Sequence, residues 1–157
     1  MRPRLVVALG GLIATLILAG CGGSSSSSST SGEALSKSEF LAQGNAICAK
    51  GGEEIQAAGK KVFTTDKAPS QATQEKFATD TIIPNVQQQI DGIEALTPPS
   101  GDETQVKAIT DAAQSALDKA KSDPSLLTDQ GNGADPFAQA NKLADAYGLD
   151  KCGSGSG

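Results

Sequence analysis

The most reactive side chains in this sequence belong to three cysteines, Cys21, Cys48 and Cys152. A cysteine can carry a lipid, form a disulfide, bind a metal or act as a nucleophile. The sequence contains no His, and its only Met is Met1. Catalytic triads that need His are therefore excluded, and haem and copper sites lack their usual ligands. A zinc site would need Cys48, Cys152 and carboxylates from distant segments, so we expect no metal and no cofactor.

The acidic and glycine-rich segments are weak candidates for a site. The loop Asp129–Asp135 has the oxygen-rich look of a calcium loop, but Gly131 and Gly133 stand where side-chain ligands should be. The pairs Glu53–Glu54 and Asp102–Glu103 are adjacent in the chain, so on a helix their carboxylates point apart. We therefore expect a connecting loop, solvated helix faces and no catalytic residue.

The first 20 residues have the layout of a secretory signal peptide. Arg2 and Arg4 form a basic start, and Leu5–Ala19 is apolar apart from two glycines and Thr15. This apolar run of about 15 residues is shorter than the ~20 that span the hydrocarbon core of a bilayer. A cleaved signal is therefore favoured over a transmembrane helix.

The signal ends in the sequence LAGC, Leu18–Cys21, which resembles the lipobox of bacterial lipoproteins. The resemblance implies that the Cys21 thiol receives a diacylglyceryl group and that cleavage leaves Cys21 as an N-terminus that can also be acylated, for example with palmitate. Such a protein lies outside the cytoplasm, anchored to the outer face of the cell membrane. The alternative is an ordinary signal peptide with a chance cysteine.

The segment after Cys21 is expected to be a tether. Gly22–Ala34 reads GGSSSSSSTSGEA and has no large apolar residue to bury, so it cannot offset the entropy of ordering. Such a chain has an average reach of ~20 Å. We assign residues 21–35 to the lipidated cysteine and tether, 36–152 to one folded domain, and 153–157 to a flexible tail.

The charge of the mature chain argues against two classes of partner. Without residues 1–20, the chain contains 11 lysines and 18 acidic residues, which gives a net charge of −7. Such a surface disfavours nucleic acid and does not attract anionic lipid head groups. Membrane attachment is therefore expected through the lipid on Cys21 alone.

In an oxidising compartment the two remaining cysteines, Cys48 and Cys152, are expected to form a disulfide. Closing a loop of about 100 residues contributes up to ~4.7 kcal/mol in the chain-entropy model. The alternative is a pair of reactive thiols. Each cysteine has only a single Lys nearby and no Arg or His to lower the pKa of its thiol.

Two helical patterns occupy the first part of the domain. Ser36 and Glu39 fit a capping box, and apolar residues at helical spacing follow as far as Val62. A second pattern runs from residue 70 to 96. It contains Pro84, which predicts a kink because proline removes a helix hydrogen bond.

Two further helices are predicted after the break at residues 97–102. The third spans 103–121, with Asp102 as its cap, and a short turn follows at residues 123–127. The fourth has Asp135 as its cap and ends before Gly148, a typical stop residue.

These patterns predict an all-α domain, a four-helix up-down-up-down bundle, since no segment alternates as a strand does. In this topology the end of the fourth helix lies beside the start of the first. Cys48 lies about three turns into the first helix. It can therefore meet Cys152 if the fourth helix ends short, or if the chain after Gly148 folds back.

The few aromatic residues are expected mainly in the core. A second interpretation is that some of them line an apolar slot between helices, where ligands often bind. Small residues could leave such a slot open or could simply let the helices approach closely. The residues concerned are Phe40, Phe63, Phe77, Phe137 and Tyr147, with the small residues Gly44, Ala113, Ala116, Ala140 and Ala144.

Three segments add a wider resemblance. Phe40–Lys50, Leu96–Glu103 and Asp135–Cys152, after a lipobox and a Ser-rich tether, resemble a group of small helical lipoproteins of actinobacteria. That resemblance implies a fold and a location but no activity.

The function expected from the sequence is non-enzymatic binding. The chain would bind an envelope protein or a small apolar ligand through its bundle. The alternative is a purely structural surface lipoprotein without a specific ligand. An open slot would favour binding, whereas a filled core would favour the structural role.

The lipobox makes a prediction about processing. The wild-type protein should partition into detergent, whereas Cys21→Ser should leave an unprocessed precursor, because both lipidation and cleavage depend on the thiol. Phase partitioning and intact mass measure the two properties. Normal processing and lipidation of Cys21→Ser would contradict the lipobox assignment.

Overall fold

Helices account for all regular secondary structure in residues 33–64, 69–128 and 135–153, the residues that this computed structural model describes. The helices are α1 (Lys37–Val62), α2 (Gln71–Phe77), a π turn (Ala78–Ile82), α3 (Ile83–Glu94), α4 (Glu103–Ser122), a 3-10 turn (Pro124–Leu127) and α5 (Ala138–Tyr147). The signal, Cys21, most of the tether, most of the Asp129–Asp135 loop and the last four residues lie outside the described residues.

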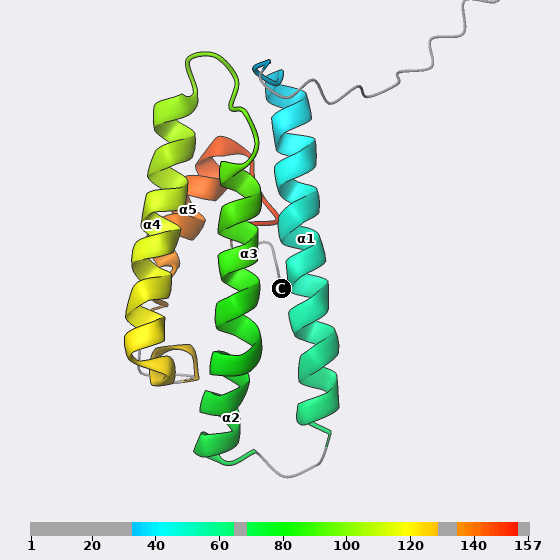
Figure 1. Ribbon diagram of the computed structural model, residues 1–157, viewed down its shortest axis with the longest axis vertical. Coiled ribbons are helices and arrows are strands. Elements are labelled where there is room, and N and C mark those ends of the chain that lie inside the picture. Colours follow the sequence, from blue (N-terminus) through cyan, green and yellow to red (C-terminus); the bar gives the residue numbers. More distant parts are fainter. Residues whose placement is uncertain (1–32, 65–68, 129–134, 154–157) are drawn as a thin grey trace, which may run out of the picture. The chain divides into compact units, whose positions relative to one another are not determined.

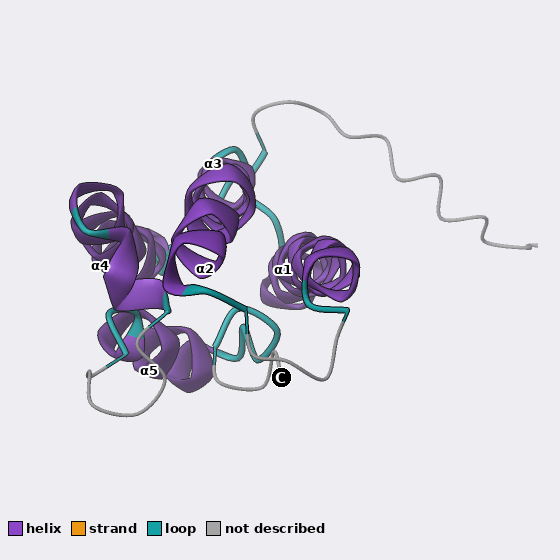
Figure 2. Ribbon diagram, turned by 90° about the horizontal axis from the view of Figure 1, so that it is seen from below, coloured by secondary structure: helices purple, strands orange, loops and turns teal. Residues whose placement is uncertain are grey.

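The helices form the predicted all-α bundle, and successive long helices run in alternating directions (Figure 1). The α2–π–α3 segment acts as one long helix between α1 and α4, and α5 packs along α4 (Figure 2). Between α1 and α5, helix-to-helix packing is sparse. One side of the bundle is therefore closed mainly by the chain that follows α5.

The start of α1 follows the prediction from sequence. The Ser36 hydroxyl accepts a hydrogen bond from the Glu39 backbone N–H at 3.3 Å, and the Glu39 carboxylate accepts one from the Ser36 N–H at 3.0 Å. This capping box satisfies two backbone donors that a helix start leaves without partners.

Two glycines of α1 allow neighbouring segments to approach its backbone. At Gly44 an added Cβ would lie 2.6 Å from Leu149 Cδ2, and at Gly51 it would collide with the Gln89 amide. Gly52 differs, since a Cβ there meets no heavy atom within 4 Å. The low helix propensity of Gly44 and Gly51 is therefore offset by close packing.

The helical segment before Pro84 changes from α to π hydrogen bonding. The Ile83 N–H bonds to the Ala78 carbonyl, five residues back, at the end of the π turn. A π turn re-pairs the backbone around an inserted irregularity. A π turn therefore directly precedes Ile83 and Pro84, near the place where the sequence predicted a kink.

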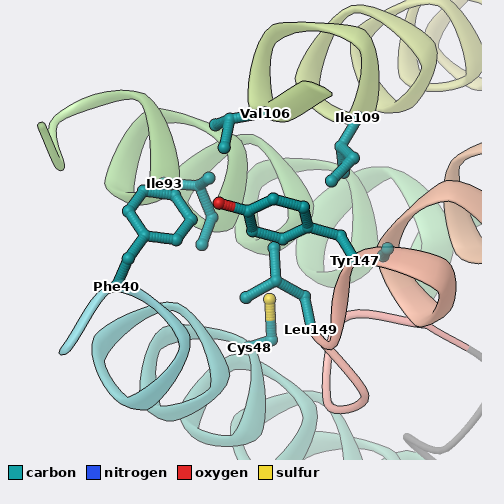
Figure 3. Packing of buried hydrophobic residues seen from close by; sticks show 8 residues of the cluster. Phe40, Cys48, Ile93, Val106, Ile109, Tyr147 and Leu149 are labelled. Atoms are coloured by element: carbon teal, nitrogen blue, oxygen red, sulfur yellow. The ribbon is translucent and has the colours of Figure 1, made fainter. Parts of the chain in front are cut away.

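The main buried cluster surrounds Tyr147 (Figure 3). The Phe40 ring lies 5.9 Å from the Tyr147 ring in a perpendicular arrangement, a favourable geometry for aromatic pairs. Ile93, Val106 and Ile109 from α3 and α4 pack around the same cluster. Tyr147 thus joins α5 to all three neighbouring helices at one end of the bundle.

The chain folds back after α5 and returns to α1. Gly148 adopts a left-handed conformation with φ 102°, and the following Leu149 is fully buried. The Asn45 side chain holds this turn twice: its amide donates to the Gly148 carbonyl at 3.1 Å, and its oxygen accepts from the Lys151 N–H at 2.8 Å. Cys152 then reaches Cys48.

The predicted Cys48–Cys152 disulfide is present, with Cα atoms 5.0 Å apart across a sequence separation of 104. Cys48 is buried, and both cysteines belong to or contact the cluster around Tyr147. The bond therefore fixes the chain after α5 against the middle of α1.

Three helix boundaries differ from the prediction, the smallest difference being that α4 ends at Ser122, one residue later than expected. The last helix begins at Ala138, because Pro136 and Phe137 form a turn in which Asp135 accepts hydrogen bonds from the Phe137 N–H and the Asn141 amide at 2.8 and 3.0 Å. The second helical segment ends at Glu94, two residues before the predicted end.

Reduction of the disulfide should lower the free energy of unfolding by ~2–5 kcal/mol and loosen α5 first. The helix has only 10 residues, so it is marginal by itself, and its contacts with α1 run largely through the turn that the bond holds. Hydrogen exchange on oxidised and reduced protein measures this order. Unchanged exchange in residues 138–147 after reduction would contradict it.

Candidate functional site

Residues of α1, α3, α4, α5 and the C-terminal turn line a slot of about 430 Å³. Its inner wall is apolar and includes the Cys48–Cys152 disulfide. The apolar lining residues, with the two glycines, are Cys48, Gly52, Ile55, Val86, Ile90, Ile93, Ile109, Ala113, Phe137, Ala140, Ala144, Leu149, Cys152 and Gly153. The side of the bundle where α1 and α5 pack sparsely is therefore hollow.

Small side chains on two helices leave this space open. Ala113 on α4 and Ala140 and Ala144 on α5 line the slot where larger side chains would fill it. Two other small residues that the sequence suggested do not line it: Leu149 occupies the space beside Gly44, and Ala116 is buried elsewhere. Of the five small residues that the sequence suggested could leave a slot open, three therefore line it.

The mouth of the slot is polar. Gln56, Asp135 and Lys151 are exposed lining residues, and Asn141 is partly exposed. Asp135 and Lys151 carry opposite charges, so the mouth has no dominant sign among its described residues.

The polar side chains of the slot make hydrogen bonds within the protein. The Thr110 hydroxyl, on a residue only 4% exposed, donates to the Lys107 carbonyl at 3.2 Å. The Gln89 amide donates to Asn85 at 2.8 Å, and the Gln56 oxygen accepts from Lys60 at 3.2 Å. No buried side-chain N or O atom in the described residues lacks a partner. The slot therefore demands no polar group from a ligand.

The aromatic residues divide among three places. Phe137 lines the slot, whereas Phe40 and Tyr147 pack in the core. Phe63 and Phe77 contact each other edge to face, with ring centres 5.0 Å apart, beside a second hollow of about 300 Å³. Core packing therefore explains most of the aromatics, as the sequence indicated, and only Phe137 borders the slot.

The residue predicted to cap the third helix has a different role. Asp102 makes no side-chain cap bond to α4. Its Oδ2 atom instead accepts from the Tyr147 hydroxyl at 2.8 Å and from Lys37 Nζ at 3.0 Å. The Glu103 carboxylate bonds the Gly101 N–H at 2.8 Å. Asp102 therefore occupies the predicted N-cap position of α4, but its side chain makes no cap bond, because two donors from distant helices compete for this carboxylate.

This network links the starts of α1 and α4 with the end of α5. Lys37 Nζ also lies over the Tyr147 ring, 2.9 Å from its centre. Hydrogen bonds from Lys37 and Tyr147 lower the pKa of Asp102. Burial opposes the charge on Lys37, but its bonds to Asp102 and Tyr147 outweigh this and raise the pKa of Lys37. Burial raises the pKa of Tyr147.

Sequence reasoning missed the two residues that hold the wall of the slot. Leu149 had a usable signal, since an apolar residue after a C-terminal glycine often packs back on its helix. Asn45 had none, because its two partners lie more than 100 residues away in the chain. The described residues contain no cluster of three or more side chains that could bind a metal ion.

The comparisons with known proteins return no relative. No protein-family model matches the chain, and neither a curated protein nor a solved structure matches it significantly. Among the described helices, none is both long and apolar enough to cross a bilayer.

The Asp102 network predicts a dependence of stability on pH. Because folding lowers the pKa of Asp102, its contribution is fully present above the ordinary carboxyl pKa of about 4 and is lost as pH falls through the lowered value. Tyr147→Phe should raise the pKa of Asp102, and Asp102→Asn should flatten the loss of stability below about pH 4. Carboxyl NMR titration and urea unfolding measure these effects, and an unchanged Asp102 pKa in Tyr147→Phe would contradict the assignment.

Proposed function

We propose that this chain is a lipid-anchored extracytoplasmic protein that binds a small apolar ligand in the slot and carries out no reaction. The observation that carries the proposal is the slot itself. Its volume of about 430 Å³ falls in the range of roughly 300–1,000 Å³ typical of small-molecule pockets. Its apolar wall and polar mouth are also typical of such sites.

The sequence supports the location and the absence of catalysis. The LAGC sequence at Leu18–Cys21 supports a lipid anchor at the membrane, as in the lipoproteins that it resembles. The chain has no His, and the slot is lined by alkyl groups, one phenyl ring, a disulfide, amides, one hydroxyl and two side chains of opposite charge. Such a lining offers no activated nucleophile and no paired acid and base.

The alternative from sequence was a structural lipoprotein with a filled core. The slot favours binding over this alternative, because an apolar cavity left open forfeits packing energy that a purely structural bundle would gain by filling it. The Tyr147 cluster shows that the same bundle packs closely elsewhere, with Phe40 fully buried and Val106 only 4% exposed.

A direct test uses the uncharged fluorescent probe N-phenyl-1-naphthylamine and residues 31–157. This segment forms one compact unit and contains every residue of both buried clusters. The probe should bind wild type, and Gly52→Leu should weaken binding at least tenfold, because position 52 lines the slot and has free space for a side chain.

Two matched variants serve as controls. Gly52→Ala adds only a methyl group at the same position and should keep binding. Ala57→Leu adds the larger side chain at an exposed position of α1 outside the slot and should also keep it. Circular dichroism checks that each variant is folded. A wild-type protein that binds no probe, or a Gly52→Leu variant that binds like wild type, would contradict the proposal.

A further inference from the structure

The lining of the slot indicates what kind of ligand it accepts. Each helix contributes residues three or four positions apart, so the lining residues form stripes parallel to the helix axes. On α1 the stripe runs from Cys48 to Gln56, which corresponds to about 12 Å at 1.5 Å per residue. On α5 it runs from Phe137 to Ala144, and α4 contributes only one turn. On α3 the stripe runs from Val86 to Ile93, so the slot is elongated along α1, α3 and α5.

The inner part of the slot offers little to a polar ligand. Thr110 is the one polar side chain on a buried lining residue, and its hydroxyl proton is already bonded to a backbone carbonyl. Burying an unpaired polar group there would carry its full desolvation cost. A hydrocarbon meets no such penalty and gains contact with the alkyl wall and the disulfide.

The residues at the mouth do not select for one type of polar head group on the ligand. Gln56, Asp135 and Lys151 are exposed, so a polar head can remain in water there. Asp135 and Lys151 have opposite charges, so the described lining residues give the exposed part of the slot no dominant sign of charge. Differences in affinity between ligands must then come from the part of the ligand that lies inside the slot.

We propose that the slot binds the hydrocarbon chain of a single-chain amphiphile, with the chain lying along α1 and α5 and the head at the mouth. This inference rests on the proposed function, and it adds that chain length sets the affinity and head charge does not. Each methylene that enters should tighten binding about threefold to fourfold, until the slot is full.

The experiment is displacement of N-phenyl-1-naphthylamine by straight-chain alcohols of six to sixteen carbons, each below its micelle concentration. Carboxylates and trimethylammonium compounds of matched chain length replace the alcohols in parallel series. The Kd should fall by about threefold to fourfold per methylene and then reach a plateau. Changing the head at constant length should alter the Kd less than adding two methylenes does.

A variant locates the chain within the slot. Gly52→Val fills part of the slot beside α1 and should move the plateau to shorter chains, whereas Ala57→Val, outside the slot, should leave it unchanged. Equal displacement by all chain lengths, or stronger displacement by a compact cage alcohol of equal carbon number, would overturn the inference and leave the proposed function standing. Failure of the probe itself to bind would overturn both.

Discussion

The attachment of the C-terminal turn to α1 is the constraint on which the rest of the structure depends. α5 packs along α4, but its own contacts with α1 are few. Leu149 fills the space beside Gly44, Asn45 holds the turn by two hydrogen bonds, and Cys152 bonds to Cys48. Without these contacts the bundle would be three packed helical layers with a short fourth helix attached on one side.

The same attachment creates the cavity. A turn reaches α1 at fewer points than a full-length helix would, so the space beside it stays open. The alanines of α4 and α5 extend this space, and the disulfide forms part of its wall. The attachment of the C-terminal turn to α1 and the slot beside it thus have the same origin. Both result from the shortness of α5 and from the chain reversal at Gly148 that follows it.

The end of the bundle where α1 begins is closely packed, unlike the region of the slot. Asp102 accepts from Lys37 and Tyr147, and Tyr147 also packs against Phe40. Three helix ends therefore meet at one carboxylate and one ring. This end is closed by aromatic and charged contacts, whereas the slot lies further along the bundle, where Ala113, Ala140 and Ala144 are among the lining residues.

The local features of this protein were determined by its sequence. The capping box at Ser36, the stop at Gly148 and the all-α bundle follow from contacts within a few residues and from apolar spacing. The pairing of Cys48 with Cys152 followed by elimination, since Cys21 was assigned to lipid. The tertiary structure alone decided that Asp102 faces Tyr147 instead of capping α4, and that Ala140 faces a slot whereas Ala116 faces the core. The physical reason is that these outcomes depend on which distant side chains compete for one carboxylate or one space, and residue spacing along a single helix does not specify that.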